Sequence, residues 1–389
     1  MHTTSAPPSF SGTSVDEVLR SHLADKRRDI SETATASAIQ AAVGTLDDDL
    51  YRRALGAVDL ESPQAAPVTH KTPFDIASIT KALVGSVLAM QAIDEGRVDW
   101  DTPLADISKL WRRRSDPPSK SATFLQLLNH TSGLPAWREF YLEFPLDPDA
   151  EQADATRTEI LETIAAMPLE GAPGSTHSYS DLGYLLLAHL LEELFEAPLR
   201  SLARRRIFEP LGLRHTDYVH CRESPNQFRN AVVTEDCARR GRIVRGTVHD
   251  ENTNIIGGVS THAGVFSTAD DLLQFGRHLL AIDSGRVPTV EPLVSRDTLQ
   301  FAWSKDRAST VGHHVAGWDT PSGDRSSAGS GFDREHTVGH LGFTGTSIWI
   351  ERKRKVVSVL LTNRVYPTRE NEGIKDLRIA FQDAILPPQ

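Results

Sequence analysis

A serine and a lysine three residues apart are the first residues whose types and spacing could do chemistry. Ser78-Ile79-Thr80-Lys81 opens a strongly apolar stretch that runs to Arg97. Apolar residues on nearly every side predict a buried helix, and residues at i and i+3 share one helix face. The Ser78 hydroxyl and the Lys81 ammonium are therefore expected to touch. A lysine inside a core requires a partner, because burying an unpaired charge is costly.

A nucleophilic serine also needs a base for its proton and donors for the oxyanion that forms. Lys81 is the nearest candidate base, if burial or a neighbouring cation lowers its pKa. Tyr179 is a second candidate, acting as a phenolate held in that form by Lys81; it lies in a polar loop before an apolar helix. Taken singly, Ser78 fits an ordinary helix cap and Tyr179 fits an aromatic anchor of the following helix.

The segment Gly339-His340-Leu341-Gly342-Phe343-Thr344-Gly345-Thr346 is the third candidate element. Glycines at alternate positions of a strand let a substrate backbone lie close. They also expose backbone N–H groups that could form an oxyanion hole. By itself, the segment fits an ordinary edge strand equally well.

Both ends of the chain are predicted to contain the strands and helices that position these residues. A helix is predicted over 15–29, and strands over 37–43 and 50–58 are joined by a turn at Asp47-Asp48-Asp49. Near the C-terminus we expect strands over 336–340, 346–351 and 356–362, and helices over 269–282 and 372–385. The middle of the chain favours helices over 123–129, 156–167, 182–195 and 199–207.

These patterns predict an α/β chain of the α+β type, with one antiparallel sheet built from both chain ends and flanked by helices. Residues 15–389 are expected to form a single domain. It consists of an α/β lobe, about 15–100 and 255–389, and an inserted all-helical lobe, about 101–254. Residues 1–14 contain little to bury and are expected to be a disordered tail. A cleft between the lobes is a natural place for a site.

Composition excludes several classes of protein. The chain has 389 residues, 39% of them hydrophobic and 24% charged, which is ordinary for a globular protein. A net charge of −10 argues against a nucleic-acid partner. Two cysteines, Cys221 and Cys237, exclude a disulfide-dense scaffold, and they could pair or stay free. The oligomeric state is left open.

No run of apolar residues is long enough to predict a membrane span. The N-terminus lacks the basic and apolar regions of a signal peptide, which predicts a cytoplasmic protein. A mis-assigned start would instead allow a periplasmic or secreted one.

Two other hydrolase classes lack their motifs. No Gly-x-Ser-x-Gly is present, which argues against an α/β-hydrolase. No His-Glu-x-x-His is present, and His313-His314 is adjacent instead of helically spaced. We therefore expect neither a metal nor a cofactor. A non-catalytic binding or assembly module remains an alternative, although it has no evident need for Ser78, Lys81 and Tyr179 together.

In this order, the three candidate elements resemble the serine β-lactamase and penicillin-binding protein superfamily. The tyrosine in the second element points to the class C β-lactamase-like branch, which includes esterases and D-amino-acid peptidases. Several flanking segments carry the same resemblance, and together they span roughly residues 35–385: Phe74–Ser78, Leu128–Pro135, Phe266–Leu272, Gly339–Trp349 and Leu360–Arg364.

The resemblance implies a serine hydrolase that forms an acyl-enzyme on Ser78, with Lys81 and Tyr179 sharing the proton transfers. It implies an oxyanion hole from the backbone N–H groups of Ser78 and Phe343. His340 and Gly342 would line the strand that docks the substrate. Asp181, His262 and the segment His249–Asn252 would be further polar contacts. The substrate would be a small ester, amide or peptide.

Two positions depart from the pattern of the superfamily. Asp181 stands where class C β-lactamases have Asn, and an ionised Asp cannot donate a hydrogen bond to a substrate carbonyl. His340 replaces the Lys of Lys-Thr-Gly, and a histidine is largely neutral at pH 7. Both changes favour an esterase or a D-amino-acid peptidase over the alternative, a β-lactamase or a DD-peptidase.

Overall fold

A seven-stranded antiparallel sheet forms the centre of the molecule. A computed structural model describes residues 12–25, 27, 30, 34–62, 65–114 and 120–387. The strand order is β2-β1-β12-β11-β10-β9-β8, so strands from both chain ends share one sheet, as predicted. The strands are β1 (Ala38–Gly44), β2 (Asp49–Gly56), β8 (His314–Val315), β9 (Trp318–Asp319), β10 (Thr337–Gly342), β11 (Thr346–Glu351) and β12 (Val356–Thr362).

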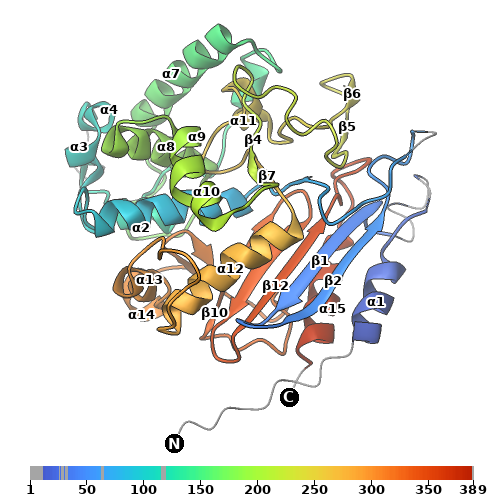
Figure 1. The fold of residues 1–389 in the computed structure, drawn as a ribbon. Helices are drawn as coiled ribbons and strands as arrows, with labels where there is room; N and C mark the ends of the chain where they lie inside the picture. The colour runs from blue at the N-terminus through green and yellow to red at the C-terminus, as the bar shows by residue number, and fades with distance from the viewer. Residues whose placement is uncertain are drawn as a thin grey trace, which may run out of the picture.

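Alternation along the strands divides the apolar residues between the two faces of the sheet. Val357 and Val359 of β12 pack into the core that contains helix α12 (Ala269–Asp283), whereas Val356 and Leu360 pack with the terminal helices. Successive side chains of a strand point to opposite faces, so one strand supplies both cores. Figure 1 shows α12 across the near face of the sheet, with α15 behind it.

The terminal helices α1 (Gly12–Ser21) and α15 (Ile374–Ile385) cover that second face. The helix predicted over 15–29 is therefore shorter and begins earlier. It ends at Ser21 because Leu23 pairs with Ala36 in a β-bridge. Of the predicted tail, residues 1–11 lie outside the described residues, and residues 12–14 belong to α1.

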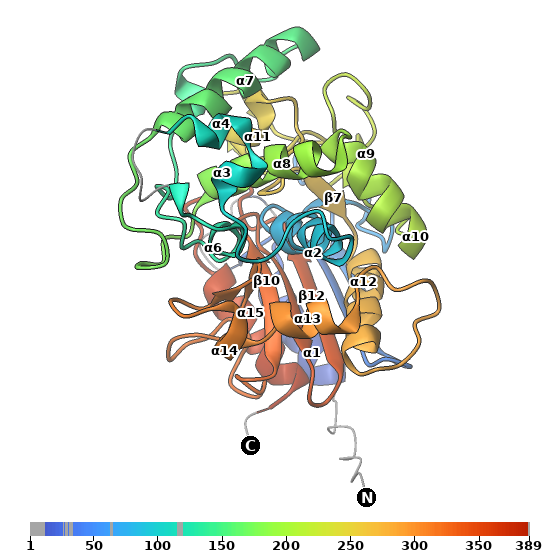
Figure 2. The ribbon, with the colours of Figure 1, turned by 90° about the vertical axis from the view of Figure 1, so that its left-hand side faces the viewer.

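The middle of the chain forms a helical region above the sheet, and Figure 2 shows α2 (Val87–Asp94) lying between the two. The largest apolar cluster includes residues of the sheet and of this helical region. That residues 15–389 form a single domain stays a prediction. The other α-helices among the described residues are α3 (Leu104–Ile107), α4 (Lys109–Arg112), α6 (Phe124–Leu128), α7 (Ala150–Ala166), α8 (Asp181–Phe195), α9 (Leu199–Ala203), α10 (Glu209–Leu211), α11 (Glu251–Ile255), α13 (Arg296–Ala302) and α14 (Lys305–Ala308).

The prediction of an all-helical inserted region is wrong, because this region also contains short strands. It contains β4 (Asp217–Tyr218), β5 (Asp236–Cys237) and β6 (Arg242–Ile243). β4 joins a second sheet of order β3-β7-β4, with β3 (Phe74–Asp75) and β7 (Val265–Ser267). These strands contain only two or three residues, too few for the alternation from which strands are predicted. The second sheet ties the inserted region to the segment that leads into Ser78.

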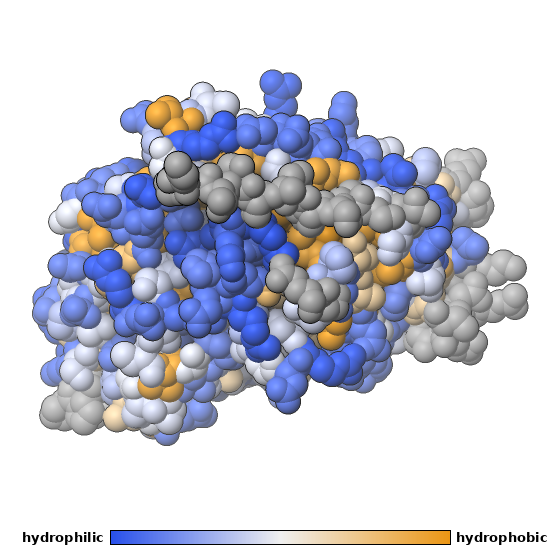
Figure 3. Space-filling model, turned by 90° about the horizontal axis from the view of Figure 1, so that it is seen from below, coloured by the Kyte–Doolittle hydropathy of each residue, from blue (hydrophilic) through white to orange (hydrophobic). Residues whose placement is uncertain are grey.

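Cys221 and Cys237 are both free. Within the described residues, no helix is long and apolar enough to cross a membrane. The face of the molecule in Figure 3 is covered mainly by hydrophilic side chains, with apolar side chains gathered in limited areas. This is expected where helices already cover both faces of the central sheet.

Candidate active site

The backbone around Ser78 has an unusual conformation. Ala77, a non-glycine residue, has a φ of +47°, a region that is costly for most side chains and is often found at functional sites. The buried carboxylate of Asp75 accepts hydrogen bonds from the backbone N–H of Ala77 at 2.9 Å and of His249 at 2.7 Å. These bonds hold the turn that presents Ser78.

The helix after Ser78 starts as a π-helix over Lys81–Ser86 and continues as α2, whereas the sequence predicted one α-helix. Such wider turns are rare and are frequent at functional sites. The spacing of apolar residues could not distinguish a π-helix from an α-helix here, because every residue of Lys81–Ser86 is buried.

Lys81 donates hydrogen bonds to three polar partners at this site. Its side chain is 0% exposed, and Nζ donates to Ser78 Oγ at 3.0 Å and to Asp181 Oδ1 at 2.7 Å. Nζ also donates to the carbonyl of His262 at 3.3 Å. Burial by itself lowers the pKa of Lys81, but Asp181 and Tyr179 together outweigh it, so the pKa lies above its ordinary value. Lys81 is therefore an ammonium, and a lowered pKa does not make it a base.

Tyr179 lies against the same ammonium. Lys81 Nζ is 4.7 Å from the centre of the Tyr179 ring, and the tyrosine is 36% exposed. Burial raises the pKa of Tyr179, and the positive charge of Lys81 opposes this without reversing it. Asp181 shares the charge of Lys81, which weakens its pull on the phenol. The resting residue is a neutral phenol, so the prediction of a resting phenolate is wrong.

The oxyanion hole at the backbone amides of Ser78 and Phe343 stays a prediction, and both residues line the cavity in front of Ser78. Within the described part of the chain, the N–H groups of Ser78 and Phe343 donate no hydrogen bond. The end of β10 lies close to the residue two before Ser78, because a Cβ at Gly342 would come within 2.4 Å of the Ile76 carbonyl oxygen. Thr346 Oγ1 donates to the same oxygen at 3.0 Å. Only glycine permits this approach.

The sequence did not single out an arginine that supports this strand end. Arg378 of α15 donates to the carbonyls of Gly342 and Thr346, each at 2.7 Å. The Gly342 carbonyl and the Phe343 N–H belong to one peptide group. Arg378 is 8% exposed, and among the described residues it forms no ion pair. Burial lowers the pKa of Arg378 to about 9. Arg378 comes close to the end of β10 through the packing of α15, so no local sequence motif predicts this contact.

A cavity of about 620 Å³ opens in front of Ser78. Phe343 and Trp137 at its wall are 49% and 45% exposed. The cavity brings together several predicted site residues and basic residues that were not predicted. Its lining includes Ser78, Tyr179, Asp181, His249, Asp250, Glu251, His262, Gly342, Phe343, Arg364, Arg369 and Arg378.

His340 and His262 do not have the surroundings expected of substrate contacts. His340 is buried and is not part of the cavity wall. Its ring is tilted against that of Tyr179, with 6.3 Å between the ring centres. Burial, together with the charge of Lys81, lowers the pKa of His340 to about 3, so it is neutral. His262 lines the cavity, but its two ring nitrogens are within 2.9 Å of Ser260, Thr253 and Asp250. Its contribution is the carbonyl that accepts from Lys81.

Two groups of side chains could hold a metal ion, although the sequence indicated none. His177, His313 and His314 form one group, and Glu235, Cys237 and Glu251 form the other. Arg369 already bonds both carboxylates of the second group. The first group has no such occupant among the described residues.

Comparison with known proteins gives consistent results. The Beta-lactamase family model matches residues 27–382. An Escherichia coli (strain K12) protein provisionally named a D-alanyl-D-alanine carboxypeptidase is 28% identical over 342 residues, covering 81% of this chain and 75% of that protein.

Two solved structures share the fold. EstCE1, described as a hydrolase with promiscuous acyltransferase activity, is 19% identical with a TM-score of 0.71, covering 96% of this chain and 97% of that chain. A penicillin-binding protein from Bacillus halodurans is 18% identical with a TM-score of 0.64, covering 87% and 92%. With a family match over most of its length, the chain belongs to the Beta-lactamase family and is a serine hydrolase of the serine β-lactamase and penicillin-binding protein superfamily.

Proposed function

We propose that Ser78 attacks the carbonyl of a small ester or amide and is released from its acyl-enzyme by water. The observation that carries this proposal is the position of Lys81, whose ammonium bonds both the Ser78 hydroxyl and the Asp181 carboxylate at the wall of an open cavity. A fully buried charge in contact with a hydroxyl is an arrangement that a binding module does not need.

The deprotonated form of Tyr179, a minor form at neutral pH, takes the proton of Ser78 in this proposal. Lys81 remains an ammonium, and it stabilises that phenolate and the negative charge that develops on Ser78 Oγ as the proton leaves. The N–H groups of Ser78 and Phe343 bind the oxyanion of the tetrahedral intermediate. Tyr179 then gives the proton to the leaving group. In deacylation Tyr179 takes a proton from water, which attacks the acyl carbon, and returns it to Ser78 Oγ as the acyl–serine bond breaks.

Esters and D-aminoacyl amides are the substrates we favour. His340 supplies no cation at the position where the pattern of the superfamily has a lysine for the substrate carboxylate of a penicillin or a D-Ala-D-Ala peptide. Asp181 adds an acceptor where a donor would be needed for a substrate carbonyl.

A DD-carboxypeptidase is the second candidate. Arg364 and Arg378 line the cavity without forming an ion pair among the described residues, so they could face a substrate carboxylate. The E. coli relative carries that name. Both arginines already donate to backbone carbonyls, which is why this candidate ranks second.

Intact-mass labelling tests the proposal directly. The wild-type chain, Ser78→Ala and Ser175→Ala are each treated with a fluorophosphonate and, separately, with a penicillin. We expect one fluorophosphonate adduct on wild type and on Ser175→Ala, none on Ser78→Ala, and little penicillin adduct. A stable penicillin adduct would support the carboxypeptidase candidate. Equal labelling of wild type and Ser78→Ala would refute Ser78 as the nucleophile.

A further inference from the structure

Three histidines from distant parts of the chain meet behind Tyr179. His177 precedes Tyr179 by two residues, while His313 and His314 lie at the start of β8. One ligand atom from each residue lies within 4.8 Å of the others, and His177 Nε2 is 2.9 Å from His314 Nδ1. Two nitrogens bound to one zinc ion at about 2.1 Å are at most about 4.2 Å apart. Small side-chain movements would therefore let all three rings bind one ion.

The surroundings of this group contain polar atoms that lack partners. The Nε2 atoms of His130 and His340 are buried without a hydrogen bond among the described residues, and both rings lie next to His314. The Asp319 Oδ1 atom is also buried without a hydrogen bond, at 3.7 Å from His313 Nε2. Buried polar atoms without partners are costly and are rare in native proteins. An ion among these rings would place a positive charge beside the carboxylate.

The local chain is shaped to let His177 reach the group. Gly312 has a φ of +81°, and a Cβ at this position would come within 2.4 Å of the His177 ring. The ring therefore lies directly against backbone that only glycine provides. His313 is 40% exposed in its side chain, so the group is accessible from solvent, whereas His314 is buried.

We propose that His177, His313 and His314 bind a divalent transition-metal ion of the zinc type, with Asp319 or water as the fourth ligand. Imidazole nitrogen suits zinc and its neighbours in the first transition row, whereas calcium and magnesium prefer oxygen ligands. The ion would join the loop that carries Tyr179 to β8, and so stabilise the position of that tyrosine. The inference goes beyond the proposed hydrolysis, which needs no metal.

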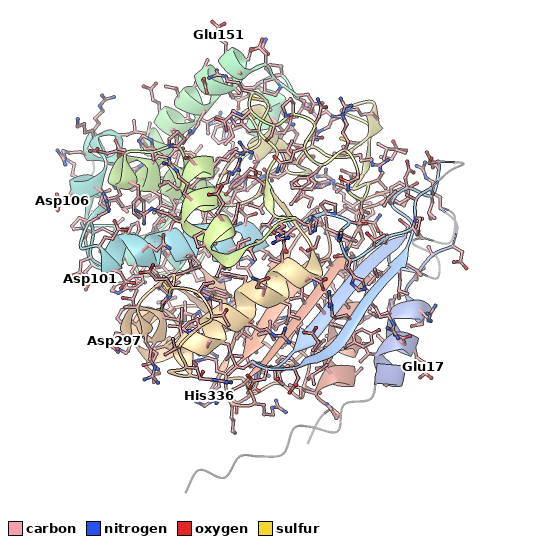
Figure 4. The ribbon with its side chains drawn as sticks, viewed as in Figure 1. Glu17, Asp101, Asp106, Glu151, Asp297 and His336 are labelled. Carbon is pink, nitrogen blue, oxygen red and sulfur yellow. The ribbon has the colours of Figure 1, made fainter. Side chains whose placement is uncertain are left out.

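Metal binding to the full chain tests the site. The protein is freed of metal with EDTA, dialysed, and titrated with ZnCl₂ by calorimetry, and with CoCl₂ while visible absorption is recorded. The variants are His177→Gln and His313→Gln. The control is His336→Gln, because the His336 side chain is exposed and lies at the edge of the molecule (Figure 4), and His336 is not one of the three proposed ligands.

We expect one equivalent of Zn²⁺ to bind wild type and the control alike, and either cluster variant to bind about tenfold more weakly or worse. Zn²⁺ should raise the melting temperature of wild type and the control only. Gly312→Ala keeps every ligand but displaces the His177 ring, so it should weaken binding too. Equal affinity in wild type and both cluster variants, or no binding by wild type, would overturn the inference. Fluorophosphonate labelling of Ser78 on the same samples reports separately on the proposed function.

Discussion

Two buried cations flank the reacting serine, and they are held in different ways. Lys81 lies 2.7 Å from the carboxylate of Asp181, and this ion pair keeps its pKa above the ordinary value. Among the described residues, Arg378 has only backbone carbonyls as hydrogen-bond partners, and burial lowers its pKa to about 9. The charge of Lys81 is balanced by the carboxylate of Asp181, and its ammonium is placed to assist the proton transfer from Ser78 to Tyr179. The second cation keeps an uncompensated charge that acts on the peptide carrying the Phe343 N–H.

The difference follows from where each cation is anchored. Lys81 belongs to the helix that begins at Ser78, so the cation and the nucleophile move together. Arg378 belongs to α15, which packs on the other face of the sheet, and it reaches the end of β10 at the wall of the cavity. The site therefore has one charge that is local in sequence and another that is supplied by packing.

The largest expected effect comes from breaking the Lys81–Asp181 pair. Asp181→Ala leaves a fully buried ammonium without its carboxylate, and we expect a loss of about 3 kcal/mol in the free energy of unfolding, measured by urea denaturation.

Lys81→Met should cost less stability, since Asp181 is 22% exposed in its side chain and can be hydrated. It should lower kcat/KM for an ester by about 10³-fold. Lys353→Met, at an exposed lysine, is the matched control. Near wild-type turnover by Lys81→Met would exclude a catalytic role for this cation.

The pH dependence of turnover examines the Lys81 side of the comparison. The pKa of Tyr179 is raised above 10, so the fraction of phenolate increases as pH rises towards it. If Tyr179 is the base, kcat/KM should increase about tenfold per pH unit from pH 7 upward. Tyr179→Phe should lose most of the activity together with this dependence. A profile that is flat above pH 6 would exclude Tyr179 as the base.

The smallest expected effect concerns Arg378. Arg378→Met removes the donor to the Gly342 carbonyl, so the Phe343 N–H becomes a weaker and less well-oriented oxyanion donor. We expect kcat to fall about tenfold, less than for direct loss of an oxyanion donor, with little change in KM. Arg378→Lys should restore part of kcat. The stability change should be small, because losing the carbonyl bonds is offset by removing a buried charge that has no carboxylate partner. A change confined to KM would mean that Arg378 contacts the substrate instead.

Much of the fold could be predicted from the sequence. Strands β11 and β12 match their predicted bounds, because each is long and fully buried. The helix over 15–29 was predicted too long, since the pairing of Leu23 with Ala36 is not encoded in periodicity. The helix after Ser78 was predicted in place but not as a π-helix. The short strands of the inserted region carried no usable pattern.

The sequence by itself determined the contact between Ser78 and Lys81, because residues three apart in a helix meet whatever surrounds them. Only the tertiary structure decided the rest of the site. Asp181 lies 100 residues from Lys81 in the chain, and Arg378 reaches β10 through the packing of α15. His340 lies buried beside Tyr179 and His314 and does not line the cavity, although Gly342, two residues further along the same strand, does. The histidine group likewise joins segments 137 residues apart. Spacing determines what neighbouring residues can do together, whereas contacts between distant residues depend on how the chain packs.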